Sequence, residues 1–122
     1  MNTIAVYCGS RFGNNPIYKE TAKAVAEAMV ERNINLVYGG GDVGLMGVVA
    51  NTTLQGGGKV TGVITEFLKG IEGHFNLTES IVVETMHERK TIMADRSDGF
   101  IILPGGFGTM DEFMEIVTWS QL

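Results

Sequence analysis

Residues 100–117, FIILPGGFGTMDEFMEIV, change from a strand pattern to a helix pattern across a glycine-rich turn. An apolar run of strand length comes first, and apolar residues recur with helical spacing from Phe113 onward. Glycines let the backbone approach a ligand closely, and the first amides of the following helix point outward with partial positive charge. The segment from Pro104 to Glu112 therefore predicts an anion-binding turn between a strand and a helix.

The same alternation of strand and helix patterns extends along the rest of the chain. We expect strands at residues 3–8, 34–38, 59–65, 81–84 and 99–103, and helices starting near 15, at 44–54, at 86–97 and from 109 onward. The irregular stretch 66–80 is expected to hold a short helix or a lid. This pattern predicts a single domain, residues 1–122, with an α/β, Rossmann-like, doubly wound parallel sheet that binds ligands at the carboxyl ends of its strands.

Composition argues against several classes of protein. The formal net charge of −5 is unlike the clustered basic surface of a nucleic-acid-binding domain. No apolar run approaches the length of a membrane span and no leader precedes the first strand, so we expect a soluble, cytoplasmic protein. Cys8 is the only cysteine, and His74 and His87 share no ligand spacing, so we predict no metal site.

A second glycine-rich turn follows the second predicted strand. Gly39, Gly41 and Gly44 satisfy the G-x-G-x-x-G spacing of dinucleotide-binding proteins. In that fold the motif follows the first strand, and an acidic ribose partner stands about 20 residues on, whereas that distance here falls near Lys59. A nicotinamide cofactor is therefore disfavoured. A tight turn with close helix packing, or a contact to a mononucleotide phosphate or ribose, explains the glycines instead.

The third turn, TMHERK at residues 85–90, opens the helix after the fourth predicted strand. Thr85 and Glu88 have the spacing of a helix capping box, which gives Glu88 a structural role. Arg89 and Lys90 follow within the first two turns, where cations oppose the helix dipole, so an anionic partner is expected. The alternative is a solvated surface pair. Because adjacent helical residues project about 100° apart, one residue should serve the site, and we favour Arg89.

Glu112 also has a structural alternative. Thr109 and Glu112 form a second possible capping box, which alone would explain their spacing. Capping does not explain the preceding Pro104–Gly108 turn. Arg89 and Glu112 each open the helix after one of two successive strands, so we expect both at the same edge of the sheet.

Together, the segments Pro104–Glu112 and Met86–Lys90 closely resemble the LOG (Lonely Guy) family of cytokinin-activating phosphoribohydrolases. The family pattern PGGxGTxxE is complete, and the Arg-Lys pair stands upstream as in the family. The resemblance covers the whole chain and extends to Tyr7–Ser10, Tyr38–Gly41, Gly44–Gly47 and Thr118–Leu122. Family members continue beyond this last segment, so we expect the usual C-terminal strand and helix to be lacking from the sheet.

The resemblance implies a reaction without a cofactor. Family members hydrolyse the N-glycosidic bond of an N6-modified adenosine 5′-monophosphate to free base and ribose 5-phosphate, and they form homodimers. Many relatives are labelled lysine decarboxylases, but Lys90 opens a helix beside an arginine, and nothing in the sequence marks a pyridoxal-phosphate site. The alternative function is a nucleotide or cofactor carrier of the same fold that binds without catalysis.

The resemblance also implies which residues act. Arg89 and Glu112 are the expected catalytic pair: the carboxylate stabilises positive charge on the ribose and polarises water, while the guanidinium orients it and lowers its pKa. The expected substrate contacts are Ser10, Gly41, Glu72, Met86, Lys90, Gly105, Gly106, Phe107, Gly108, Thr109 and Thr118. Among them, Gly106, Gly108 and Thr109 hold the phosphate, and Glu72 lies in the irregular stretch.

Overall fold

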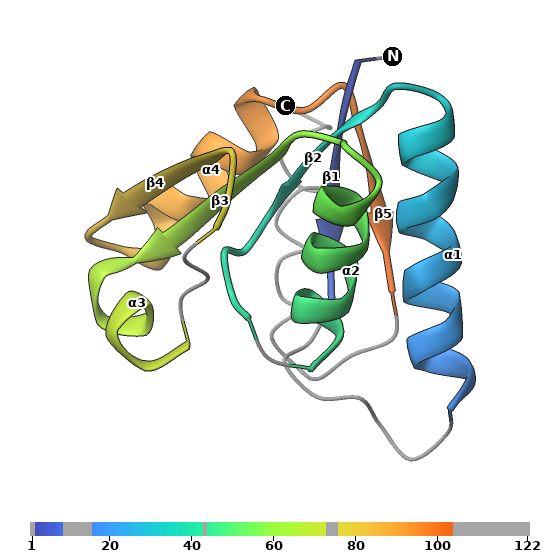
Figure 1. Ribbon diagram of the computed structural model, residues 1–122. Coiled ribbons are helices and arrows are strands. Elements are labelled where there is room, and N and C mark those ends of the chain that lie inside the picture. Colours follow the sequence, from blue (N-terminus) through green and yellow to red (C-terminus); the bar gives the residue numbers. More distant parts are fainter. Residues whose placement is uncertain (1, 9–15, 43, 73–75, 104–122) are drawn as a thin grey trace.

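The structure, a computed structural model, describes residues 2–8, 16–42, 44–72 and 76–103. Its strands are β1 (Thr3–Tyr7), β2 (Asn35–Tyr38), β3 (Val60–Thr65), β4 (Glu79–Val83) and β5 (Gly99–Ile102). All of them pair in parallel, in the order β4-β3-β2-β1-β5 (Figure 1). The predicted parallel α/β sheet is therefore confirmed.

Helices connect the strands. They are α1 (Ile17–Glu31), α2 (Gly44–Gln55), α3 (Glu66–Glu72) and α4 (Met86–Asp95). From β1 the chain steps outward to β4, and α4 then carries it back across the sheet to β5 on the other side of β1. This reversal makes the sheet doubly wound, and folds of this kind bind ligands at the carboxyl ends of the strands that flank the reversal, here β1 and β5.

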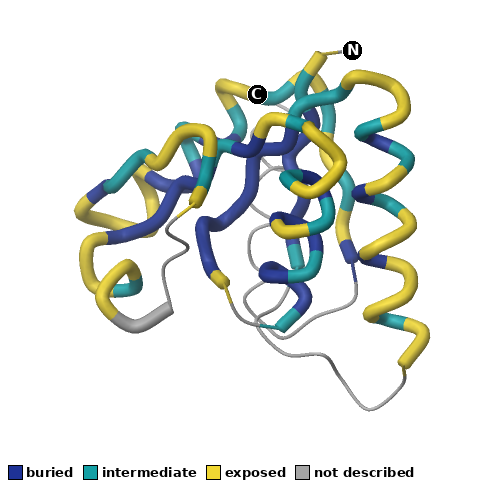
Figure 2. The backbone as a smooth tube through the Cα atoms, viewed as in Figure 1, coloured by how far each residue is buried: buried dark blue, intermediate teal, exposed yellow. Residues whose placement is uncertain are grey.

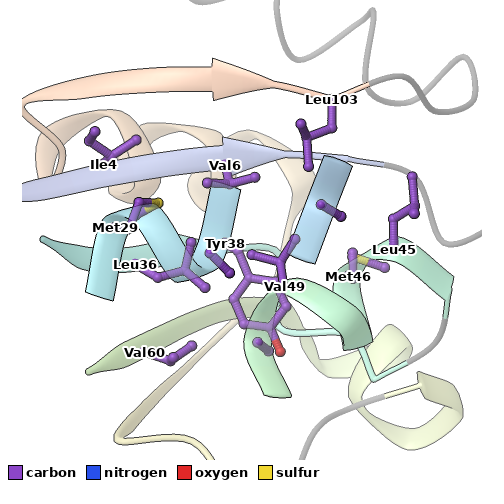
Figure 3. Packing of buried hydrophobic residues seen from close by; sticks show 13 residues of the cluster. Ile4, Val6, Met29, Leu36, Tyr38, Leu45, Met46, Val49, Val60 and Leu103 are labelled. Atoms are coloured by element: carbon purple, nitrogen blue, oxygen red, sulfur yellow. The ribbon is translucent and has the colours of Figure 1, made fainter. Parts of the chain in front are cut away.

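Side chains alternate between the two faces of the sheet, and each face packs against its own helices. On one face α1 and α2 cover a cluster that includes Ile4, Val6, Leu36 and Tyr38 of the strands (Figure 3). On the other face, Met93 of α4 packs against Ala5, Tyr7, Val37, Val63 and Val83. The central strands β2 and β3 are therefore almost wholly buried, whereas α1 exposes its outer side (Figure 2).

The glycines at residues 56–58 end α2 as their sequence suggests. Gly57 has a φ of +83°, the left-handed conformation that glycine adopts without strain. The N–H groups of Gly56 and Gly58 donate to Thr52 O and Thr53 O at 3.1 and 2.9 Å. The last carbonyls of the helix are thereby satisfied, and the chain turns directly into β3.

Several predicted boundaries differ from the observed ones by one residue, and those at the start of β4 and the end of α4 differ by two. β4 begins at Glu79, two residues before the apolar run, because Thr61 pairs with Glu79 in register and Thr78 Oγ accepts from Val60 N at 3.0 Å. α4 ends at Asp95 and not at Ser97, whose hydroxyl donates to Met93 O at 2.6 Å.

In the stretch 66–80, the expected short helix is α3. The helix expected from residue 109 lies outside the described residues. Within the described ranges, no helix has both the length and the apolar character needed to cross a bilayer.

Candidate functional site

The site begins at the amino end of α4, which the predicted cap fixes. Thr85 is extended, and its hydroxyl oxygen accepts from Glu88 N at 3.1 Å. The same hydroxyl donates to Glu88 Oε1 at 3.3 Å, so Glu88 has the structural role that its spacing indicated. Because Thr85 and Glu88 occupy the exposed side of this first turn, the next residue, Arg89, turns inward.

Arg89 is a buried cation, with only 6% of its surface exposed. Its Nε donates to Val63 O and its Nη2 donates to Gly39 O, both at 2.8 Å. Charge-assisted hydrogen bonds of this length are among the stronger polar contacts in proteins, and they offset part of the cost of burying the guanidinium. The interpretation of Arg89 and Lys90 as a solvated surface pair is therefore wrong, since Lys90 is buried as well.

The glycine-rich turn after β2 is held by Tyr38. Its buried hydroxyl donates to Gly41 O at 2.7 Å, and Gly40 between them has a φ of +78°. Burial raises the pKa of the Tyr38 hydroxyl above its ordinary value, and the charges of Asp42 and Cys8 raise it further while Arg89 opposes them. The hydroxyl therefore remains protonated and keeps Gly41 at the carboxyl end of the sheet.

Two further expected contacts come from the carboxyl ends of β3 and β4. Met86 opens α4, is 41% exposed, and places its Sδ 3.7 Å from Arg89 Nη1. Glu72 is the last residue of α3, the helix that directly follows β3. The structure therefore brings Arg89, Gly41 and Met86 to one rim, and Glu72 belongs to a helix that starts from the same rim.

The turns after β1 and β5 start side by side. Tyr7 pairs with Ile102, and Leu103 N donates to Tyr7 O at 2.8 Å. Leu103, the residue before the glycine-rich segment, therefore lies at the switch of strand order, two strands away from the strand that precedes Gly39. Two strand spacings are about 10 Å, which is within the reach of one small ligand.

Several expected contacts lie outside the described residues. They are Ser10, Gly105, Gly106, Phe107, Gly108, Thr109, Glu112 and Thr118. The pairing of Arg89 with Glu112 and the phosphate cradle therefore stay predictions. In the part of the chain that is described, no group of three or more His, Cys, Asp or Glu residues could hold a metal ion.

Sequence reasoning missed the partners of Arg89. Val63 lies inside a buried strand and contributes only its backbone carbonyl, which leaves no mark in the sequence. Gly39 and Tyr38 stand in a recognisable glycine motif, but the motif does not show that the carbonyl of Gly39 binds a guanidinium from α4. The one signal that the sequence offers is that the glycine whose carbonyl is bound is followed by a second glycine, which needs a positive φ.

Comparison with known proteins gives a consistent family. Residues 46–122 match a family model described as "Possible lysine decarboxylase". The chain is 50% identical over 120 residues to a probable cytokinin riboside 5′-monophosphate phosphoribohydrolase, LOGL1, of Oryza sativa subsp. japonica, covering 98% of this chain and 54% of that protein. It is 49% identical over 121 residues to the phosphoribohydrolase LOG2 of Arabidopsis thaliana, covering 98% and 56%. The chain thus spans about half the length of these curated relatives.

Solved structures support the fold. The molybdenum cofactor carrier protein of Chlamydomonas reinhardtii superposes with a TM-score of 0.83 at 19% identity, over 98% of this chain and 72% of that one. At this identity the likeness concerns the arrangement of strands and helices, and it carries no information about the ligand.

Proposed function

This chain belongs to the LOG (Lonely Guy) family, and we propose that the protein hydrolyses the N-glycosidic bond of an N6-modified adenosine 5′-monophosphate. The products are the free base and ribose 5-phosphate, so the reaction activates a cytokinin nucleotide. The names of the relatives favour this hydrolysis over the decarboxylation in the description of the family model.

The burial of Arg89 is the structural observation that supports this proposed function most strongly. Arg89 is buried at the rim of the sheet, in a setting that costs stability unless the charge is used. A cation needed only for solubility would serve equally well on the surface. A guanidinium held rigidly by two strands is suited to orienting a carboxylate or the oxygens of a ribose phosphate.

In the proposed reaction the C1′–N9 bond breaks and its electron pair goes to the base, while a water oxygen forms a new bond to C1′. Positive charge develops on the ribose ring as the bond lengthens. Glu112 stabilises this charge and accepts a proton from the attacking water, the leaving base takes up one proton from solvent, and Glu112 then returns its proton to solvent. Arg89 orients the carboxylate of Glu112 and lowers its pKa, so that it is ionised when needed.

The 5′-phosphate anchors the substrate in this proposal. The amides of Gly105 to Gly108 and the hydroxyl of Thr109 bind it beside the turn after β1, which carries Ser10. Binding energy from the phosphate then holds C1′ against Glu112. A nucleoside without the phosphate is therefore expected to be a poor substrate.

We further propose that the protein acts as a cytoplasmic homodimer, without a metal or cofactor and without binding nucleic acid. The net charge of −5 supports the last point, because a nucleic-acid surface repels an acidic protein. The alternative, a carrier that binds the nucleotide without cleaving it, would need the glycine turns but not Glu112.

The decisive experiment compares Glu112→Gln with the unchanged protein, using N6-isopentenyl-AMP and AMP as substrates and chromatography to detect the free base. Glutamine still serves as the third residue of a capping box, so the fold should persist while base release falls at least about 100-fold, the scale of losing a general base. Glu88→Gln is the matched control, because it alters the equivalent position of the α4 cap without entering the site.

If Glu112→Gln released base at the unchanged rate, Glu112 would be only a cap and the proposed mechanism would be wrong. Nucleotide binding by calorimetry, with no base released by the unchanged full-length protein, would instead favour the carrier.

A further inference from the structure

We infer that Gly39 is a positioning residue for Arg89: the absence of a side chain makes room for the guanidinium, and the Gly39 carbonyl sets its orientation. The inference deepens the proposed function and rests on it for its catalytic consequence. Its geometric part concerns described residues alone and can be tested without any enzymatic activity.

The guanidinium occupies the space that a side chain at residue 39 would need. A Cβ built on Gly39 would overlap Arg89 Nη2 and would lie 3.0 Å from Arg89 Cζ. The next nearest atom, Met46 Sδ, would be at an ordinary contact distance of 3.5 Å. The conflict is therefore with one group, the guanidinium of Arg89, and not with the surrounding core.

Backbone conformation does not account for the glycine. Among the described glycines only Gly40, Gly44 and Gly57 have positive φ, so residue 39 has a conformation that alanine also adopts. The neighbouring Gly40 differs, because it has a φ of +78° and its Cβ would lie 2.9 Å from Ile64 Cβ. The fold thus explains Gly40, while Arg89 explains Gly39.

Two carbonyls from two strand segments define the plane of the guanidinium. Gly39 O, just after β2, binds Nη2, and Val63 O within β3 binds Nε. Nη1 then lies on the side of Met86, the exposed residue at the rim. Losing the Gly39 contact would remove one of these two backbone anchors and let the planar group tilt away from its orientation at the rim.

Orientation matters because an arginine acts through a fixed fork of N–H donors. Displacing a catalytic group by about 1 Å can cost on the order of 100-fold in rate. Gly39 touches neither substrate nor reacting atoms in this scheme. It acts only by holding Arg89 where the substrate and Glu112 meet it.

The test is Gly39→Ala in the full protein. We expect kcat to fall at least about tenfold with a smaller change in KM, because the displaced guanidinium is needed in the transition state. Two other glycine-to-alanine variants serve as controls. Gly70 is exposed in α3 with no atom within 4 Å of an added Cβ, so Gly70→Ala should leave kcat unchanged and should not lower the melting temperature, because alanine favours a helix more than glycine does.

Gly58→Ala is the control for a purely structural clash. A Cβ at residue 58 would lie 2.8 Å from Thr53 Cγ2. Residue 58 precedes β3 and so lies at the amino ends of the strands, whereas Arg89 lies at their carboxyl ends. Gly58→Ala should lower the melting temperature while kcat, measured well below that temperature, stays within twofold of the unchanged protein, about the scatter of such measurements. A similar profile for Gly39→Ala would overturn the inference.

A double-variant cycle separates action through Arg89 from independent damage. In an Arg89→Ala background the added methyl group no longer meets a guanidinium, so Gly39→Ala should cause no further loss of kcat. In the same background, Gly39→Ala should no longer lower the melting temperature, or should raise it. Full additivity of the two changes would contradict the inference. If Gly39→Ala alone fails to fold, the double variant should fold, and failure of both would reject the proposed clash.

The guanidinium itself provides a readout that needs no activity. The Nε–H of Arg89, buried and bound to Val63 O, should give a slowly exchanging signal in a proton–nitrogen correlation spectrum, identified by its loss in Arg89→Ala. Gly39→Ala should shift this signal and speed its exchange. An unchanged signal would overturn the inference. Absence of base release by the unchanged protein would overturn the proposed function instead, and the spectrum would still decide the geometry.

Discussion

Arg89 combines a full charge with almost complete burial, and two of its hydrogen bonds go to backbone carbonyls of other elements. Carbonyl oxygens carry only partial charge, so these two contacts hold a cation without neutralising it. A guanidinium fixed in this way can act on a bound anion or on a carboxylate. A carboxylate in place of either carbonyl would have weakened this action.

At this scale we predict that Arg89→Lys abolishes base release although the charge is conserved. A lysine ammonium is a point donor and does not reproduce the fork that meets Val63 O and Gly39 O together. Leaving a buried carbonyl unsatisfied should lower the free energy of unfolding by about 1–3 kcal/mol. Denaturant titration and single-turnover assays measure the two effects. Normal turnover by the lysine variant would show that only charge is required.

The first turn of α4 depends on Thr85, whose hydroxyl satisfies the N–H of Glu88. We predict that Thr85→Ala lowers the free energy of unfolding by about 1 kcal/mol, the usual value of an N-cap. For a domain of this size the melting temperature should fall by roughly 4 °C. Thr85→Ser keeps the hydroxyl and is the matched control. Equal melting temperatures for the alanine and serine variants would mean that the cap contributes nothing.

The elements show what sequence patterns can and cannot predict. Apolar strand runs and the Thr85–Glu88 cap correctly gave the parallel sheet and the start of α4, because both follow from local periodicity and hydrogen-bonding chemistry. β4 starts earlier than expected because its first residues are polar and exposed at the sheet edge, where pairing alone defines a strand. The contact of Arg89 with Val63 O depends on tertiary packing, which no local pattern encodes.

Across the whole molecule, Asp98 ties the amino end of β1 to the start of β5. Its Oδ2 accepts from Asn2 N and Thr3 N, both at 3.0 Å, and these backbone hydrogen bonds hold the pKa of its carboxyl below the usual range. Since the pKa of Asp98 is lower in the folded protein than in the unfolded chain, its carboxylate stabilises the fold at pH values above the unfolded pKa. This stabilisation is lost as pH falls below about 4 and through the folded pKa.

We predict that Asp98→Asn lowers stability at neutral pH and flattens its dependence on acid, because asparagine accepts hydrogen bonds without titrating. Melting temperatures of both proteins between about pH 7 and pH 2.5 measure this. The difference between them should shrink as the carboxyl of the unchanged protein becomes protonated. A difference that stays constant across this range would show that Asp98 does not contribute through its charge.

The position of β1 between β2 and β5 also orders events during translation. β1 is the first of the described strands to be synthesised, yet Ile4 can pair with Gly99 only after the other described strands and helices have been made. Until β5 is available, that edge of β1 stays open, and an open strand edge invites chaperones or misassociation. The pairing of β1 with β5, at the switch of strand order, is thus formed late, and such long-range pairing slows folding.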